Sequence, residues 1–297
     1  MKGVPDYLEF YGLKDHPFRL TPDTKYFFPA QPHYRAFEIL RYGIKRGEGF
    51  LVLTGKPGTG KTMLLRLLLK EDGTNKEIAL LLSPTLPPKE LLMALLEDLG
   101  IETRGENKEK LLKTFRDYLI KLAQEGKTLL LVIDEAQNLP IESLEELRLL
   151  SNLETEEKKL IQIILVGQPG LESKLNSPLL SQLLQRITIW EKLEVLSFEE
   201  TIDYIQYRWQ KAGGIFIKID KRALKLIYKA SKGIPRQINK IMDRTILFSA
   251  AERANHIEKR LVKAALESLN FSFISRKIWP WHLTLNPSLK ILTSLWW

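Results

Sequence analysis

The amino-acid sequence predicts a doubly wound α/β domain with a parallel sheet, followed by a smaller domain made only of helices. Between residue 50 and about residue 195, short and almost continuous apolar runs alternate with stretches of helical periodicity. Such runs are typical of strands that are buried on both faces, as in a parallel sheet covered by helices. Beyond residue 195 the apolar runs end, and only helical periodicity continues.

Four segments of the first domain predict buried strands. They are FLVLTG at 50–55, KEIALLLS at 76–83, KTLLLVIDEAQNL at 127–139 and KLIQIILVGQP at 159–169. We expect helical structure between and after these strands, at 61–71, 87–100, 108–126, 141–154 and 179–187. In the third of these stretches Leu111, Phe115 and Leu119 recur every four residues, which places them on one face of a helix.

The chain as a whole divides into four predicted parts. Residues 1–45 form an aromatic lead-in punctuated by prolines, with a short helix at 34–42, which we expect to pack on the main body. Residues 46–195 form the α/β domain, 196–270 the helical domain and 271–297 a tail. Four periodic stretches make up the helical domain, at 198–214, 221–233, 235–253 and 258–270.

The composition excludes several classes of site. The 297 residues contain no cysteine, so disulfides, thiolate metal sites and a cysteine nucleophile are excluded, and the four histidines are scattered. The first residues, MKGVPDYLEF, lack the apolar core of a secretory signal. No run approaches the roughly 18 apolar residues of a membrane-spanning helix. We therefore expect a protein that stays in the cytoplasm.

The net charge of +9 is concentrated in the C-terminal third of the chain. Residues 1–200 contain 27 Lys and Arg against 30 Asp and Glu, residues 201–270 contain 15 against 6, and residues 271–297 contain 3 against none. Such a local surplus indicates an acidic partner, either nucleic acid or anionic lipid. A solvated, lysine-rich helical face explains the surplus equally well.

The sequence GKPGTGKT lies at the junction between the first predicted strand and the helix after it. It matches the pattern G-x-x-x-x-G-K-[ST], in which glycines let backbone N–H groups surround phosphates at a helix N-terminus. We expect Lys61 to contact the β- and γ-phosphates of a nucleoside triphosphate and the Thr62 hydroxyl to bind Mg²⁺. The strand–loop–helix context disfavours a glycine-rich turn without a ligand. The expected nucleotide-binding residues of this loop are Gly55, Lys56, Pro57, Gly58, Thr59, Gly60, Lys61, Thr62 and Met63.

Two acidic residues, Asp134 and Glu135, follow the third predicted strand. We expect Asp134 to be the second Mg²⁺ ligand beside Thr62, and Glu135 to polarise the water that attacks the γ-phosphate. Adjacent acids after a strand also occur as a helix N-cap and its first turn. The phosphate loop earlier in the chain favours the catalytic interpretation, so the two motifs together predict a nucleoside triphosphatase.

Four more polar residues are candidates for the same site. Gln168 follows the fourth predicted strand and would reach the γ-phosphate or the attacking water, although a turn in GQPG needs no such function. Arg186 is a candidate arginine finger for a neighbouring subunit, or a solvated charge at a helix end. Arg236, in GIPRQIN, is a candidate γ-phosphate contact from the helical domain, or a plain surface arginine. Ser83 ends the second strand and is a candidate modulator of Glu135.

These motifs together resemble those of the AAA+ ATPases, in which a P-loop domain carries a C-terminal helical lid. More narrowly, YGLKDHPFRLTPDTKYFF, VIDEAQNLPIESLEELRLLSNLE, LVGQPGLESKL and LSQLLQRI resemble the ExeA/GspA family, over about residues 5–270. Members of that family act in type II secretion, and the related MshM acts in type IV pilus biogenesis. Lys56, Pro57 and Ser83 depart from the residues common in the family, which puts the role of Ser83 in doubt.

The resemblance implies ATP as the nucleotide, Mg²⁺ as the metal and a ring-like homo-oligomer. It implies sensor and finger roles for Gln168, Arg186 and Arg236, and secretion or pilus assembly proteins as partners at the inner membrane. The same ATPase core serves transposition regulators and DNA-loading initiators. Nucleic acid is therefore the alternative partner of the basic helical domain.

The tail at 271–297 contains four of the six tryptophans and no acidic residue. Indole rings beside cations suit the headgroup region of an anionic membrane. Pro280 and Pro287 would interrupt a spanning helix, so the tail is expected to lie in the interface rather than to cross it. A terminal strap that packs on the helical domain or on a neighbouring subunit is equally consistent with this sequence.

Overall fold

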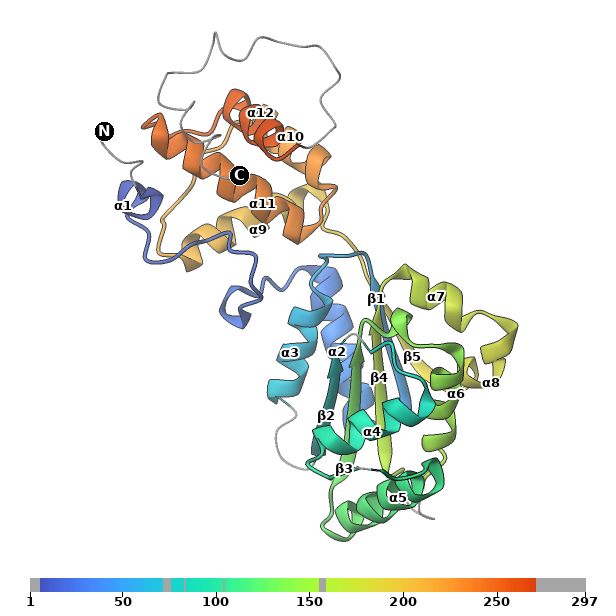
Figure 1. Cartoon of the computed structure of the whole chain (residues 1–297). Coiled ribbons are helices and arrows are strands. Elements are labelled where there is room, and N and C mark those ends of the chain that lie inside the picture. Colours follow the sequence, from blue (N-terminus) through green and yellow to red (C-terminus); the bar gives the residue numbers. More distant parts are fainter. Residues whose placement is uncertain (1–5, 72–75, 83, 104, 155–158, 271–297) are drawn as a thin grey trace. The chain divides into compact units, whose positions relative to one another are not determined.

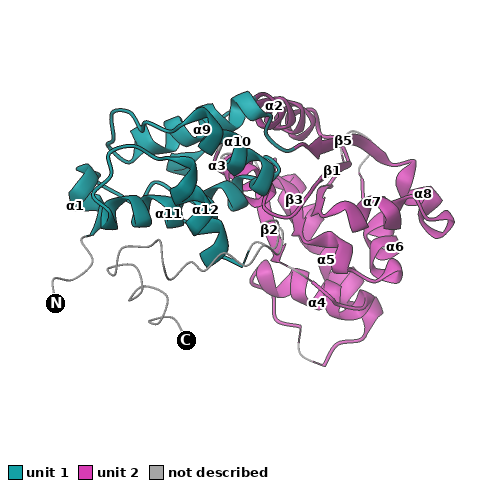
Figure 2. Ribbon diagram, turned by 90° about the horizontal axis from the view of Figure 1, so that it is seen from above, with its two compact units in different colours: residues 1–30, 195–297 teal, residues 31–194 magenta. Residues whose placement is uncertain are grey.

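The computed structural model describes residues 6–71, 76–82, 84–103, 105–154 and 159–270. Contacts within the chain divide it into two compact units, which Figure 2 shows in different colours. Residues 31–194 form one unit, here called the sheet unit. Residues 1–30 and 195–297 form the other, here called the helical unit.

The sheet unit is built on five parallel strands in the order β2-β3-β4-β1-β5 (Figure 1). The strands are β1 (Phe50–Gly55), β2 (Lys76–Leu82), β3 (Thr128–Asp134), β4 (Ile161–Gly167) and β5 (Ile187–Leu193). Every residue of β1 and β4 is buried, as the continuous apolar runs predict for a parallel sheet covered on both faces. The predicted fold class and the four predicted strands are confirmed.

Helices cover both faces of this sheet, and alternate strand residues pack on each side. Leu51 and Leu53 of β1 join one hydrophobic cluster with α2 (Gln31–Arg46) and α3 (Lys61–Glu71). Phe50 and Val52 join a second cluster on the opposite face. The elements of that face are α4 (Pro88–Asp98), α5 (Lys108–Gln124), η2 (Ala136–Asn138), α6 (Ile141–Leu150), α7 (Pro169–Leu175), η3 (Pro178–Leu180) and α8 (Ser181–Leu184).

Strand β5 is the strand that the sequence analysis missed. Its sequence ITIWEKL mixes apolar residues with Thr188, Glu191 and Lys192, so it lacks the continuous apolar run of the other strands. The reason is its place at the edge of the sheet, where it pairs with β1 and most of its residues are only partly buried. An edge strand tolerates polar side chains that a central parallel strand does not.

The predicted lead-in at 1–45 is divided between the two units. The helix expected at 34–42 is longer, runs from Gln31 to Arg46 as α2, and packs on the sheet. The earlier elements α1 (Tyr7–Tyr11) and η1 (Thr24–Tyr26) belong to the helical unit. Their aromatic residues explain this placement, because Tyr7, Phe18 and Tyr26 are buried in the hydrophobic core of that unit.

The helical unit also contains the four predicted C-terminal helices, all of which are confirmed. They are α9 (Phe198–Lys211), α10 (Lys221–Ser231), α11 (Pro235–Ala251) and α12 (Lys259–Ser268). A capping box of Ser197 and Glu200 begins α9. The buried Arg208 of α9 donates to the Pro17 carbonyl, and its guanidinium lies 4.7 Å from the Tyr26 ring centroid. These contacts attach the N-terminal segment to the helical unit.

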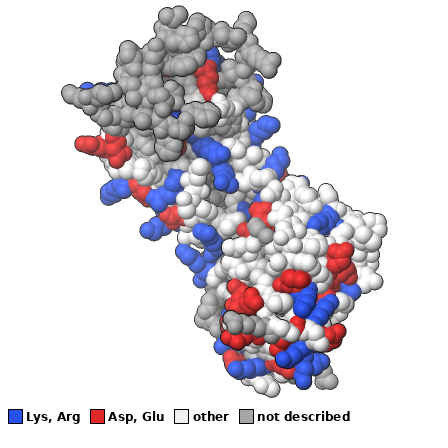
Figure 3. Space-filling model, viewed as in Figure 1, with Lys and Arg blue, Asp and Glu red and all other residues white. Residues whose placement is uncertain are grey.

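The visible surface of the helical unit carries many Lys and Arg side chains (Figure 3). Lys221, Arg222, Lys225 and Lys229 are exposed along α10. Across the described ranges, no helix is long and apolar enough to cross a membrane. The predicted tail and Ser83 lie outside the described residues.

Candidate functional site

The segment between β1 and α3 has the backbone conformation as well as the sequence that a phosphate-binding loop requires. Gly58 and Gly60 have φ values of 81° and 106°, a region that residues with a Cβ rarely adopt. The loop leads directly into α3, whose first residue is Lys61. Thr59 is buried, and its hydroxyl donates to the Lys56 carbonyl at 2.9 Å. Lys56 and Pro57 are exposed at the start of the loop, and Met63 is partly buried in the first turn of α3.

Lys61 is a buried cation inside this loop. Its side-chain Nζ donates to the carbonyl oxygens of Gly55 at 2.9 Å and Lys56 at 3.3 Å. Burial lowers the pKa of Lys61, while the negative charges of Glu135 and Asp134 oppose that shift. Lys61 forms no ion pair with any residue in the described part of the chain. A buried ammonium group without a paired carboxylate fits a phosphate ligand.

Thr62 and Asp134 bring two oxygen ligands together. The Thr62 hydroxyl donates to Asp134 Oδ2 at 2.8 Å, although the residues lie on α3 and at the end of β3. Asp134 is buried, and its other oxygen accepts from the Glu135 backbone N–H at 2.9 Å. A hydroxyl and a carboxylate at the rim of a phosphate loop are the donors that Mg²⁺ prefers. The residues present therefore fit the metal.

Glu135 lies beside this pair, in a conformation that few residues other than glycine adopt. Its φ is 54°, in the left-handed region. Its carboxylate Oε2 accepts hydrogen bonds from Gln168 Nε2 at 2.8 Å and Gln137 Nε2 at 2.6 Å. The structure therefore places Gln168 directly against the predicted catalytic carboxylate.

Gln137 is a site residue that the sequence analysis missed. Besides donating to Glu135, its side-chain oxygen accepts from the Gln168 backbone N–H at 2.9 Å. Lys174 of α7 donates to the carbonyls of Gln137 and Leu139, both at 2.6 Å, and so holds the short helix η2. The signal was present in DEAQ, where the glutamine follows Glu135 by two residues.

His33 is a second missed residue, and it lies beneath the phosphate loop. It is buried in the first turn of α2, and its Nε2 donates to the Thr59 carbonyl at 2.8 Å. A Cβ on Gly60 would lie only 3.3 Å from the same nitrogen. No sequence pattern points to this contact, because the rest of α2 and the whole of β1 lie between His33 and the loop in the chain.

Arg186 is not part of this cluster in its own chain. It lies just before β5, and its Nη1 donates to the Ser151 hydroxyl at 3.3 Å. Strands β1 and β5 are parallel, with Phe50 opposite Ile187 and Gly55 opposite Leu193. Arg186 therefore lies at the amino end of the sheet, about 20 Å from the loop at the carboxyl end, given about 3.3 Å per strand residue.

Arg236 belongs to the helical unit. It follows Pro235 in the first turn of α11, and the preceding Gly233 carbonyl accepts from the Leu196 backbone N–H at 2.9 Å. This bond fixes the start of α11 to the beginning of the chain segment that leads into α9.

The chain matches a family model described as an AAA domain over residues 44–175. Over 251 residues it is 41% identical to general secretion pathway protein A of Aeromonas hydrophila, which covers 84% of this chain and 46% of that protein. Over 144 residues it is 28% identical to a potential ATP-binding protein of Staphylococcus aureus, which covers 47% of this chain and 50% of that protein. The chain thus spans about half the length of these two relatives.

A third relative is the ATP-dependent target DNA activator B of Escherichia phage Mu, 26% identical over 80% of this chain and 77% of that protein. Among solved structures, Cdc6p of Pyrobaculum aerophilum is similar with a TM-score of 0.63, at 18% identity, over 86% of this chain and 71% of that chain. The Thermotoga maritima RuvB branch migration motor is similar with a TM-score of 0.54, at 23% identity, over 80% of this chain and 68% of that chain. At these identities the solved structures show a shared fold.

Proposed function

Because the chain belongs to the AAA+ P-loop ATPases of the ExeA/GspA family, we propose that it uses Mg²⁺-dependent ATP hydrolysis to drive assembly of a secretion or pilus machine. The observation that supports this most directly is the cluster at the carboxyl end of the sheet. Lys61, the Thr62–Asp134 pair and the Glu135–Gln168 pair meet there in one chain. A phosphate loop, an oxygen ligand pair and a positioned carboxylate are the parts that ATP hydrolysis requires.

In the proposed reaction, Lys61 exchanges its contacts with the Gly55 and Lys56 carbonyls for the β- and γ-phosphate oxygens. Thr62 and Asp134 hold Mg²⁺, which when bound neutralises charge on the phosphates. Glu135 accepts a proton from water as the water oxygen bonds to the γ-phosphorus. The bond to the bridging oxygen breaks, and its electron pair remains on ADP, so the products are ADP and inorganic phosphate.

The two glutamines set the direction of the Glu135 carboxylate in this proposal. Gln168 is placed to exchange its contact with Glu135 for the γ-phosphate, which would couple nucleotide state to the position of the base. Gln137 keeps its contacts on both sides, with Glu135 and with the Gln168 backbone. We assign Gln168 a sensor role and Gln137 a positioning role.

The two arginines are proposed to act from outside the loop. Arg236 acts from the helical unit as a contact of the γ-phosphate, so that residues 196–270 serve as a lid. Arg186 acts in trans, because the parallel pairing of β1 and β5 puts it at the opposite end of the sheet from its own loop. This role requires self-association of the chain into a ring-like oligomer, as AAA+ ATPases with arginine fingers form.

We propose that the partners of this ATPase are secretion or pilus assembly proteins at the inner membrane, which it reaches from the cytoplasm. The identity with general secretion pathway protein A supports this choice over other clients. An anionic membrane surface is the proposed contact of the tail at 271–297.

A DNA-bound ATPase is the second candidate, favoured by one specific observation. Residues 201–270 contain 15 Lys and Arg against 6 Asp and Glu, and exposed cations lie along α10. The similarity to the phage Mu DNA activator over 80% of this chain also supports this second candidate. Polyanionic DNA would pair with such a surface.

ATPase measurements with two polyanions separate the two functions. ATP turnover is measured with Mg²⁺ and with EDTA, and then with anionic liposomes and with double-stranded DNA in turn. We expect turnover that needs Mg²⁺ and rises with liposomes. Stimulation by DNA and not by liposomes would replace the assembly function by the DNA-bound one, and turnover unaffected by EDTA would contradict the magnesium role.

A further inference from the structure

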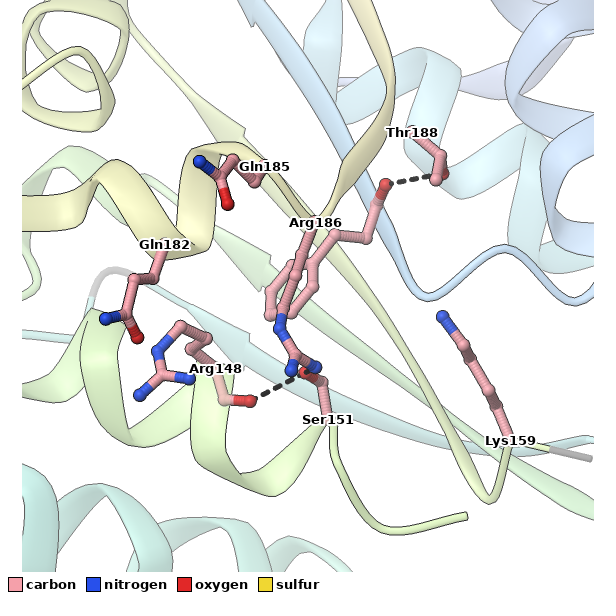
Figure 4. Close-up of a pocket in the computed structure, with 8 residues that line it drawn as sticks. Arg148, Ser151, Lys159, Gln182, Gln185, Arg186 and Thr188 are labelled. Atoms are coloured by element: carbon pink, nitrogen blue, oxygen red, sulfur yellow. Dashed lines mark hydrogen bonds between the residues drawn. The ribbon is translucent and has the colours of Figure 1, made fainter. Parts of the chain in front are cut away.

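A pocket of about 660 Å³ lies at the amino end of the sheet, and Figure 4 shows the residues that line it. The phosphate loop follows β1 at the carboxyl end of the sheet. Three elements supply most of its wall: the end of α6, helix α8 and the start of β5. The lining residues are Phe50, Arg148, Ser151, Lys159, Gln182, Gln185, Arg186 and Thr188. Its volume lies within the range of small-ligand sites, roughly 300–1,000 Å³.

The pocket gathers three cations, of which Arg148 is paired with an acid outside the lining. Arg148, Lys159 and Arg186 are cationic, and none of the described residues that line the pocket is acidic. Neither Arg186 nor Lys159 forms an ion pair with a residue in the described ranges. Arg148 pairs through its Nε with Glu145 at 2.8 Å, which leaves its other guanidinium N–H groups available. In Figure 4, Arg186 lies between Arg148 and Lys159.

The exposed carboxamides of Gln182 and Gln185 in the wall can donate hydrogen bonds to anions as well. The two hydroxyls are already engaged, because Thr188 donates to the Phe50 carbonyl at 3.1 Å, and the buried Ser151 hydroxyl accepts from Arg186 while donating to the Arg148 carbonyl. Ser151 thereby holds the arginine that lies at the centre of the group. Cations and carboxamides around one opening are groups that bind phosphate oxygens.

We infer that this pocket receives the triphosphate of the nucleotide held in the phosphate loop of a second copy of the chain. Lys159 and Arg148 then act beside Arg186 on the same phosphate oxygens. The inference rests on the proposed ATPase function and extends the trans-acting site from one arginine to three cations. In phosphoryl transfer the main task is to stabilise the negative charge that develops on the γ-phosphate oxygens. Because the phosphate loop itself contributes one buried cation, Lys61, further cations from a second copy would add to this stabilisation.

Two observations favour a phosphate borne by a second copy over a freely diffusing nucleotide. The cationic residues Arg186 and Lys159 are exposed, so the pocket opens to the surface where another molecule can dock. The wall also offers little to hold a nucleotide base, since its one aromatic residue, Phe50, is only 1% exposed. The pocket can therefore bind a phosphate group, but it offers no exposed aromatic ring on which a nucleotide base could stack.

Single substitutions in the pocket test the inference. Lys159→Ala and Arg148→Gln should each lower ATP turnover about 10–100-fold, the value of a charged hydrogen bond. Arg186→Ala should lower it about 10³-fold or more, as expected for an arginine finger. Nucleotide affinity, measured with a fluorescent ATP analogue, should not change, because the loop is intact. Lys121→Ala, an exposed lysine on α5, is the matched control and should keep wild-type turnover.

Mixing experiments identify the source of the phosphate. Lys159→Ala chains are mixed with Glu135→Gln chains, which keep both an intact loop and an intact pocket but lack the base. In a head-to-tail assembly, about one interface in four of an equal random mixture joins a competent loop to a competent pocket. Turnover of the mixture should therefore rise clearly above that of either variant alone.

Each other outcome counts against the inference. No recovery in mixtures that are shown to co-assemble would overturn it, and so would a failure of the two variants to co-assemble in ATP. Normal turnover of Lys159→Ala and Arg148→Gln with weakened binding of double-stranded DNA would assign the pocket to nucleic acid instead. Wild-type turnover that Lys61→Ala leaves unchanged would contradict the proposed function itself, and the inference with it.

Discussion

Glu135 combines a strained backbone with two directed hydrogen bonds. A left-handed φ of 54° in a residue with a Cβ costs of the order of 1 kcal/mol or more. The conformation turns the chain sharply at the end of β3, so that the Glu135 carboxylate meets the amides of Gln137 and Gln168. Strain of this kind is concentrated at functional positions. The residue to which we assign the base is therefore one of four described non-glycine residues with a left-handed backbone, together with Lys232, Arg253 and Asn270.

Two substitutions at this site should separate binding from turnover. Lys61→Ala should abolish ATP binding, because the phosphates lose the cation inside the loop. Glu135→Gln should keep binding and lose turnover by about 10²-fold or more, because a carboxamide cannot accept the proton. Binding is measured by titration with a fluorescent ATP analogue and turnover by phosphate release. Equal turnover of wild type and Glu135→Gln would remove the base assignment.

Gln137→Ala tests the positioning role of the missed glutamine. The variant loses the donor to Glu135 and the acceptor for the Gln168 N–H, so we expect kcat to fall about tenfold or more at unchanged KM for ATP. Asn138→Ala, the exposed neighbour on η2, is the matched control and should match wild type. An unchanged or raised kcat in Gln137→Ala, with Asn138→Ala normal, would show that Gln137 does not orient the base.

Helix α1 is fixed to helix α11 by a buried polar contact within the helical unit. The Tyr7 hydroxyl donates to Asp243 Oδ1 at 2.9 Å and lies 2.6 Å from His16 Nδ1. Burial raises the pKa of Tyr7 and also that of Asp243, whose carboxylate is stabilised by the Tyr7 hydroxyl. Without that donor, Asp243 would keep the cost of burial and lose a hydrogen bond. The short N-terminal helix therefore contributes to the core of the unit formed by the C-terminal helices.

Tyr7→Phe should lower the free energy of unfolding of the helical unit by about 1–3 kcal/mol, the penalty of a buried polar group left without its partner. The measurement is urea unfolding followed by the fluorescence of Trp209, which is 3% exposed in the same core. Tyr34→Phe, an exposed tyrosine of the sheet unit, controls for the loss of a hydroxyl. Equal midpoints for Tyr7→Phe and Tyr34→Phe would contradict the role of the contact.

Over the whole molecule, the proposed hydrolytic cluster and the surplus of positive charge lie in different units. Every residue of the proposed hydrolytic cluster lies in the sheet unit, from the loop to Gln168. The surplus of positive charge lies in residues 201–297, which belong to the helical unit. The proposed nucleotide chemistry and the proposed contact with a polyanionic partner can therefore be removed separately.

Deletion of residues 271–297 is the corresponding test. It should abolish binding to anionic liposomes, because the tail supplies four indole rings and three cations, each cation worth about 1 kcal/mol at an anionic surface. Basal ATP turnover should be kept, since the last proposed nucleotide contact is Arg236. The attraction should also weaken as salt rises, because screening limits its reach to about 8 Å at physiological ionic strength.

Three results would change the assignment of the tail. Loss of basal turnover or of folding in the truncated chain would make the tail a structural strap. Unchanged liposome binding would place the membrane contact elsewhere. Salt-sensitive binding of double-stranded DNA that survives the deletion would favour the DNA-bound function, with the cations of 201–270 as its surface.

The sequence by itself determined the elements whose signals are local. Strands β1 to β4, most of the longer helices and the phosphate loop follow from hydrophobic periodicity and from a contiguous motif, because each depends on residues close together in the chain. The positions of Asp134, Glu135 and Gln168 at the ends of strands follow as well, since parallel strands present their carboxyl ends at one edge of the sheet.

Only the tertiary structure decided the features that join distant segments. Strand β5 is specified by pairing with β1 at the sheet edge, so its polar sequence carried no strand signal. The contacts of Gln137 with Gln168 and of His33 with Thr59 depend on how helices pack beside the loop. The position of Arg186, and the pocket it shares with Lys159, follow from the parallel register of two strands that are far apart in the chain. These contacts are set by packing across the sheet, and local sequence spacing contains no information about them.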